Sequence, residues 1–166
     1  MLLKGSCHCG AVRFSVRSQH PYPYMCCYCS ICRKTAGAGG YAINLAGDNT
    51  TLEVEGEENI TIYRAIIQNP EDPEPHQSKG ERRFCRQCGS FLWVYDPSYP
   101  ELMHPFAGAI DTDLPKPPEH THIMLGFATS WVEIPNSQSD RHYQRYPRES
   151  IAQWHERLGL TDKAEE

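Results

Sequence analysis

Seven of the eight cysteines fall into three short groups that could bind metal. The groups are Cys7-His8-Cys9-Gly10, Cys27-Tyr28-Cys29-Ser30-Ile31-Cys32 and Cys85-Arg86-Gln87-Cys88-Gly89. Thiolates are preferred zinc ligands, and a tetrahedral zinc ion takes four of them in a closed structural site. Seven thiolates divide most naturally into four plus three. A three-ligand site leaves one position for water or substrate, so this division favours an enzyme.

Zinc is a better explanation of these groups than disulfide bonds. Cysteines one or two residues apart are too close for relaxed disulfides, whereas this spacing suits zinc. Residues 1–4 lack the apolar segment of a secretory signal, and no apolar run is long enough to span a bilayer. We therefore expect a reducing, cytoplasmic location, in which disulfides would not persist.

The first and third groups together could form a closed site. Cys7 and Cys9 precede Gly10, and Cys85 and Cys88 precede Gly89, so each pair is followed by the residue that best permits a tight turn. A shared zinc would connect the first strand to the middle of the chain. Because metal-binding energy is also folding energy, we predict that this zinc is structural.

The second group predicts an open site. Cys27, Cys29 and Cys32 could occupy one side of a zinc ion, and the local sequence offers no obvious fourth ligand. Arg33 and Lys34 follow directly and would favour an anionic ligand. The vacant position could accept a substrate thiol as its thiolate, because zinc lowers the pKa of the groups that it coordinates.

Spacing alone leaves alternatives for this second site. Cys26, Cys29 and Cys32 form an equally regular series, and Cys26 or a histidine could close the site. The candidate histidines are His104, His120 and His122. His8 lies between two ligands and is interpreted as a spacer.

Short strands are expected to position these groups. Val12, Phe14 and Val16 alternate with polar residues between Ala11 and Arg17, which is typical of a half-buried strand. Further strand signals separated by Gly, Pro, Asn and Asp lie at 22–26, 41–45, 52–54, 60–64, 83–84, 91–95 and 122–127. This pattern predicts an antiparallel all-β domain.

The C-terminal region should form a short helix. Ile151, Trp154 and Leu158 make an apolar stripe at helical spacing between Ser150 and Leu158, and Gly159 could end the helix. We expect one domain over 1–166, in which 149–166 form the C-terminal helix and a tail frayed from Thr161. Two proline-rich segments, 69–76 and 114–118, should be surface loops, with a lid over the metal site as the alternative.

The charge balance excludes some partners. Sixteen Lys and Arg against 21 Asp and Glu give a net charge of -5, with no basic block at either end. This argues against general nucleic-acid affinity. We expect neither nucleic acid nor membrane as a partner.

The ordered cysteine motifs, with their neighbours, identify a family. The segments 5–12, 27–34 and 84–90, with Gly108-Ala109-Ile110-Asp111 and Trp131, resemble the glutathione-dependent formaldehyde-activating enzyme family, which includes centromere protein V. The likeness runs from about Leu2 to Glu133. The resemblance implies an all-β fold of the β-tent type that is stabilised by zinc, with two zinc ions per chain. It implies a structural zinc on Cys7, Cys9, Cys85 and Cys88, and a catalytic zinc on Cys27, Cys29 and Cys32.

The resemblance also implies a reaction. The family joins glutathione to formaldehyde to give S-hydroxymethylglutathione, and it is classed with carbon–sulfur lyases. Arg33 and Lys34 are then candidates for binding a glutathione carboxylate, and Asp111 is a candidate polar group near the metal.

Two other functions compete with this one. The chain could be a zinc-stabilised binding module for a protein or nucleic acid, although it lacks a basic patch. Methionine sulfoxide reduction would need a redox cysteine beyond the ligands, and only Cys26 is left for that role. We therefore favour a zinc enzyme that acts on glutathione or a related thiol and a small aldehyde.

Overall fold

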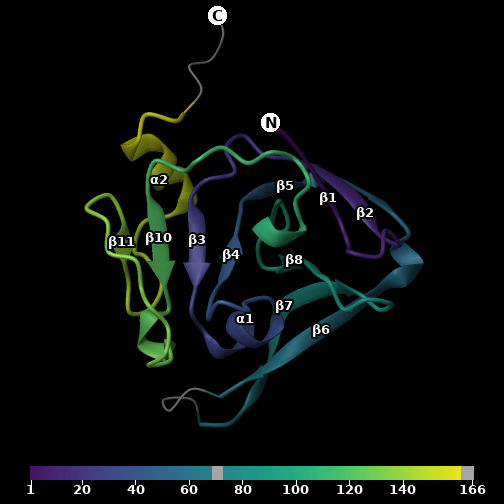
Figure 1. Ribbon diagram of the computed structural model, residues 1–166, viewed down its shortest axis with the longest axis horizontal. Coiled ribbons are helices and arrows are strands. Elements are labelled where there is room, and N and C mark those ends of the chain that lie inside the picture. The colour runs from purple at the N-terminus through teal and green to yellow at the C-terminus, as the bar shows by residue number, and fades with distance from the viewer. Residues whose placement is uncertain (69–72, 162–166) are drawn as a thin grey trace, which may run out of the picture.

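The computed structural model describes residues 1–68 and 73–161, which fold mainly into two β-sheets. The larger sheet has the strand order β1-β2-β5-β9-β8-β7-β6, and the smaller has the order β11-β10-β3-β4. Figure 1 shows the smaller sheet on the left and the larger on the right. The larger sheet consists of β1 (Leu2–Ser6), β2 (Arg13–Arg17), β5 (Gly47–Glu55), β6 (Ile60–Ile67), β7 (His76–Cys85), β8 (Phe91–Tyr95) and β9 (Leu102–Pro105). The smaller sheet consists of β3 (Tyr24–Cys27), β4 (Ala42–Asn44), β10 (His120–Ile123) and β11 (Arg141–His142).

The alternation in the first segments produces the main core. Phe14 and Val16 on β2 are buried, and the Phe14 ring packs against Trp93 on β8 with 5.0 Å between ring centroids. Gly5 on β1 allows this packing, because a Cβ atom there would lie 2.4 Å from the Phe14 ring. The all-β class is confirmed, with a short helix near the C-terminus.

One part of the smaller sheet differs from the antiparallel expectation. Strand β10 pairs in parallel with both β3 and β11, whereas β3 and β4 are antiparallel. The strand enters this sheet after a long connection from β9, and a long crossover permits parallel pairing where a tight hairpin does not. The strand also ends at Ile123, because Met124 adopts a left-handed conformation (φ 62°) and the 3₁₀ turn Leu125–Phe127 follows.

The two sheets are joined near the centre of the molecule. The Leu45 amide, just after β4, donates to the Pro105 carbonyl at the end of β9 (2.9 Å), and Asn44 bridges to Phe106. This junction fixes β4 of the smaller sheet against β9 of the larger one. Two further 3₁₀ turns cover Glu57–Asn59 and Ala107–Ala109.

Two short helices complete the described part of the fold. Helix α2 (Ile151–Arg157) is preceded by its N-cap Ser150, whose hydroxyl accepts from the Gln153 amide in a capping box, and Gly159 follows the helix with φ 64°. This confirms the predicted helix, whose Trp154 is buried. Helix α1 (Ser30–Thr35) was not predicted.

The structure describes the proline-rich segments only in part. Residues 69–72 of the first segment lie outside the described residues, as do residues 162–166 of the expected C-terminal tail. In the rest of the first segment, Pro73 and Pro75 are exposed, and His76 is the first residue of β7. The carbonyl of Pro115, in the second segment, accepts from the Tyr24 hydroxyl (2.7 Å). Within the described ranges, no helix has the length and apolar character needed to cross a membrane.

Candidate active site

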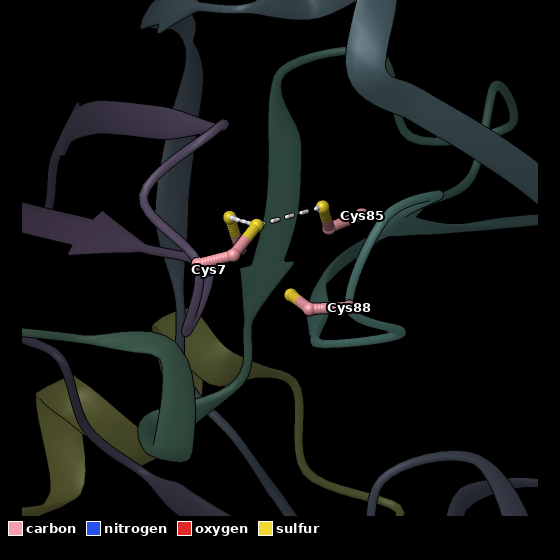
Figure 2. Close-up of side chains that lie close together, drawn as sticks. Cys7, Cys85 and Cys88 are labelled. Atoms are coloured by element: carbon pink, nitrogen blue, oxygen red, sulfur yellow. Dashed lines mark hydrogen bonds between the residues drawn. The ribbon is translucent and has the colours of Figure 1, made fainter.

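The four cysteines of the first and third groups lie together at the ends of β1 and β7. We call them the quartet: Cys7, Cys9, Cys85 and Cys88. Their sulfur atoms all lie within 4.8 Å of one another, with 3.5 Å between Cys7 and Cys9 and 3.8 Å between Cys9 and Cys85. Figure 2 shows the labelled Cys7, Cys85 and Cys88 side chains converging on one point. Zinc–sulfur bonds of about 2.3 Å in a tetrahedron place sulfur atoms ~3.8 Å apart, so the quartet fits zinc.

Glycine turns hold the quartet in place. Gly10 and Gly89 both have left-handed backbones, with φ of 77° and 73°. The turn after β1 brings the Val12 amide within 3.2 Å of the Cys7 sulfur, to which it donates. These turns are the ones that the sequence predicted from a glycine after each pair.

The quartet's pKa values show competition for negative charge. Hydrogen bonds from the side chain and backbone of Ser90 lower the pKa of Cys88 to about 5. The Ala11 amide favours the Cys9 thiolate, but the adjacent Cys7 sulfur and the other thiols raise the pKa of Cys9 to about 12. A cation among the four sulfur atoms would remove this competition, as expected for a zinc site.

The second group forms a separate cluster at the start of α1. We call Cys27, Cys29 and Cys32 the trio; their sulfur atoms also lie within 4.8 Å of one another. Cys29 caps the helix, and its sulfur accepts from the Cys32 amide (3.3 Å). Cys27 and Cys32 are buried, and Cys29 is half-buried.

The pKa values of the three trio thiols differ from one another more than those of the quartet do. Contacts with Cys27, and then with Cys32, lower the pKa of Cys29 to about 2, whereas contacts with Cys29 and Cys32 raise that of Cys27 far above its usual value. Cys27 would lower the pKa of Cys32, but Cys29 and burial raise it to about 11. Three thiols so close cannot all ionise without a cation, so this donor set also fits zinc.

No protein ligand fills the fourth position of the trio in the described part of the chain. Because successive side chains of a strand point to opposite faces, Cys26 lies on the face of β3 opposite to Cys27. There, burial and the charge of Asp140 raise the pKa of Cys26 to about 12. The three candidate histidines have other partners: the Leu45 carbonyl for His104 (2.8 Å), Asp140 for His120 (3.4 Å) and the Tyr28 hydroxyl for His122 (2.9 Å). His8 lies in the quartet's turn and is not among its ligand atoms. The geometry therefore groups Cys27, rather than Cys26, with Cys29 and Cys32.

The trio borders a cavity of about 580 Å³. Cys27 and Cys32 lie in its wall, and α2 contributes Ile151 and Trp154. The polar side chains around it include Asn44, Ser78, Arg82, Asp96, His104, Thr121, Tyr146 and Glu149. A cavity of this size can hold a small organic ligand beside the trio.

His104 and Tyr146 give this cavity two further proton-bearing groups. Burial lowers the pKa of His104, so the ring is neutral at pH 7, and its Nδ1 is paired with the Leu45 carbonyl. Its Nε2 is then the ring's proton acceptor. Tyr146 is 69% exposed as a residue, yet desolvation of its hydroxyl and the nearby trio raise its pKa to about 12.

The structure separates two predicted residues from this cavity. Arg33 and Lys34 border a different hollow, together with Asp111, between α1 and the turn that holds Cys7. The trio's cavity contains a different cation, Arg82, which the sequence analysis did not single out. The available signal was weak: a charged residue within a strand, directly before Arg83-Phe84-Cys85.

Comparisons with known proteins identify the family of this chain. Residues 2–125 match the model of the family "Glutathione-dependent formaldehyde-activating enzyme". A Halomonas elongata protein, whose name refers to the same enzyme, is 60% identical over 162 residues, covering 98% of this chain and 99% of the relative. A crystal structure of a Rhodobacter sphaeroides protein superposes with a TM-score of 0.50 and 29% identity, over 68% of this chain and 91% of that one. The chain is thus a member of the glutathione-dependent formaldehyde-activating enzyme family.

Proposed function

We propose that the chain is a zinc-dependent enzyme that joins a thiol to a small aldehyde, with a structural zinc on the quartet and a catalytic zinc on the trio. The thiol is glutathione or a close relative and the aldehyde is formaldehyde; with glutathione the product is S-hydroxymethylglutathione. One observation carries this proposal. The trio brings three sulfur ligands together beside a cavity, and no fourth protein ligand joins them among the described residues.

The reaction needs no oxidant. The thiol sulfur forms a bond to the aldehyde carbon, the carbonyl π electrons move to oxygen, and the thiol proton ends on that oxygen. A zinc ion held by Cys27, Cys29 and Cys32 would supply Lewis-acid stabilisation of a thiolate at neutral pH. The reverse reaction breaks the same carbon–sulfur bond, which is why we assign a lyase type.

The chain's own residues would bind the reactants and move the proton. The cavity walls would hold thiol and aldehyde close together, which reduces the entropic cost of their encounter. His104 is our candidate for the proton transfer, because its neutral ring can accept a proton at Nε2 while Nδ1 stays bonded to Leu45. The substrates are suggested by the family and by the name of the Halomonas elongata relative.

A cytoplasmic location stays a prediction. It agrees with all eight cysteines being free thiols in the structure, because a reducing compartment preserves zinc-binding thiols.

Titration of glutathione into the cobalt-substituted protein tests this proposal. A thiolate that coordinates cobalt held by the trio should change the cobalt spectrum, and the change should disappear in Cys32→Ser. Cys26→Ser is the matched control, because Cys26 is a buried thiol outside both clusters and its replacement should leave the change intact.

Catalysis has its own measurement. NMR exchange of ¹³C-formaldehyde with its glutathione adduct should be faster with the zinc protein than without it, and Cys32→Ser should remove the acceleration. A silent cobalt spectrum at millimolar glutathione, with no acceleration, would refute the proposal and favour a non-catalytic binding module.

A further inference from the structure

Arg82 is a buried cation whose hydrogen-bonding capacity is largely unused. It lies on β7 opposite Val94 and is 8% exposed. Its Nε and Nη1 atoms are buried and have no hydrogen-bond partner within the described residues. Burying a guanidinium without hydrogen-bond partners is energetically costly, and a ligand that pairs with it would recover part of that cost.

The acidic residues around Arg82 are engaged elsewhere. Glu81, its neighbour in sequence, forms ion pairs with Arg64 and Arg83. Glu149 binds Arg157 through both carboxylate oxygens, at 2.6 and 3.0 Å. Asp96 accepts from the Ser98 amide at 2.9 Å. These three carboxylates therefore leave the Arg82 Nε and Nη1 donors available to a ligand.

Arg82 borders the same cavity as the trio, and a second unpartnered donor accompanies it. Thr121 on β10 is 2% exposed, and its hydroxyl has no hydrogen-bond partner among the described residues. Both side chains line the cavity together with Cys27 and Cys32. Two strands from different sheets thus bring unused donors to the space beside the candidate zinc.

We propose that Arg82 and Thr121 form a subsite for a carboxylate of the thiol substrate, one of the two that glutathione carries. A guanidinium can bind a carboxylate through charge-assisted hydrogen bonds, and the Thr121 hydroxyl can add another. The identity of the ligand as a thiol rests on the proposed function. Arg33 and Lys34, the residues predicted for this role, border the other hollow.

Binding of S-methylglutathione tests the subsite without depending on zinc coordination, because the blocked sulfur cannot become a thiolate. Calorimetry on the zinc-loaded protein should show that S-methylglutathione binds more tightly than its dimethyl ester, by about 10- to 100-fold, as expected for loss of a charged hydrogen-bonded group. This comparison uses the native sequence, so it does not depend on how a variant folds.

Variants then assign the effect to residues. Arg82→Gln should weaken S-methylglutathione binding by a similar factor and leave the ester's affinity nearly unchanged, and Thr121→Val should weaken it by about 3- to 10-fold. Arg17→Gln is the matched control, because this exposed arginine lies on β2 outside the cavity. Circular dichroism and zinc content confirm that each variant is folded and loaded.

Three results would overturn the subsite. Equal affinities of acid and ester would show that no carboxylate is recognised. Loss of the preference in Arg33→Gln or Lys34→Gln, but not in Arg82→Gln, would place the carboxylate in the other hollow. Loss of zinc from Arg82→Gln with an unchanged acid preference would make Arg82 a counter-ion of the trio.

The subsite and the proposed function fail separately. An Arg82-dependent acid preference with a silent cobalt spectrum would support the subsite and remove thiol coordination. A cobalt response without any preference for the acid over the ester would support thiol coordination and remove the subsite.

Discussion

Loss of the quartet should destabilise the protein much more than loss of the trio, because the two clusters close chain loops of very different length. Cys9 and Cys85 are 76 residues apart, whereas the trio spans only Cys27 to Cys32. In the chain-entropy treatment of a cross-link, closing a 76-residue loop is worth about 4.5 kcal/mol and closing a five-residue loop about 2 kcal/mol. Small domains have a total stability of about 5–15 kcal/mol, so losing the quartet's cross-link would remove a large share of it.

The variants Cys85→Ser and Cys32→Ser compare these clusters. Both cysteines are buried, at 0% and 5% exposure, so the substitution itself is matched. With an m-value of about 2 kcal/mol per M, the urea midpoint of Cys85→Ser should lie about 1 M below that of Cys32→Ser. Circular dichroism should show the β-sheet signal intact in Cys32→Ser before urea is added.

A chelator provides the control for this comparison. Stripping metal from the native protein should lower its midpoint toward that of Cys85→Ser, and metal removal should affect that variant far less. If Cys32→Ser unfolds as early as Cys85→Ser, the trio's metal is structural and the loop-length argument is wrong.

Metal analysis of the freshly purified chain should give two zinc ions; a value of one would remove the catalytic site. Glu119→Gln should lower the free energy of unfolding at pH 7 by about 2–3 kcal/mol, as measured by urea titration. This loss is smaller than that expected for a fully buried ion pair, because the partner Arg157 is 32% exposed. Burial alone would raise the pKa of Glu119, but Arg157 and Trp154 lower it below its usual value. The carboxylate therefore contributes its full stabilisation above about pH 4.5. The difference in stability between the variant and the wild type should disappear as the pH falls through the lowered pKa. Gly89→Ala should lower the free energy of unfolding by about 1–2 kcal/mol through its left-handed backbone alone, because among the described residues a Cβ there meets nothing within 4 Å. Gly108→Ala, equally uncrowded by the described residues but without positive φ, should be near neutral in the same assay.

The local parts of the fold could be predicted from the sequence. Alternation of Phe14 and Val16 indicated β2, and the glycines after each cysteine pair indicated the turns of the quartet. Strand β1 was missed because Gly5 interrupts its apolar pattern, although the lack of a side chain there is what admits the Phe14 ring. Helix α1 was missed because its start is capped by a cysteine rather than by a usual capping residue.

The cavity could not be predicted, because its wall is assembled from distant segments. Arg82 comes from β7, Thr121 from β10, Tyr146 from the segment after β11 and Trp154 from α2. None of these residues shares a local motif with the trio. Arg33 and Lys34 follow the trio in sequence, but proximity along the chain did not place them in the same cavity.

The end of the family match at residue 125 divides this cavity into two portions. All seven cysteines of the quartet and the trio, with Arg82 and Thr121, precede that boundary, whereas Tyr146, Ile151 and Trp154 follow it. Under the proposed function, exchange of the C-terminal segment between homologues should therefore alter which thiol binds best while leaving the trio unchanged. In such an architecture, new selectivity can arise without disturbing the reactive centre.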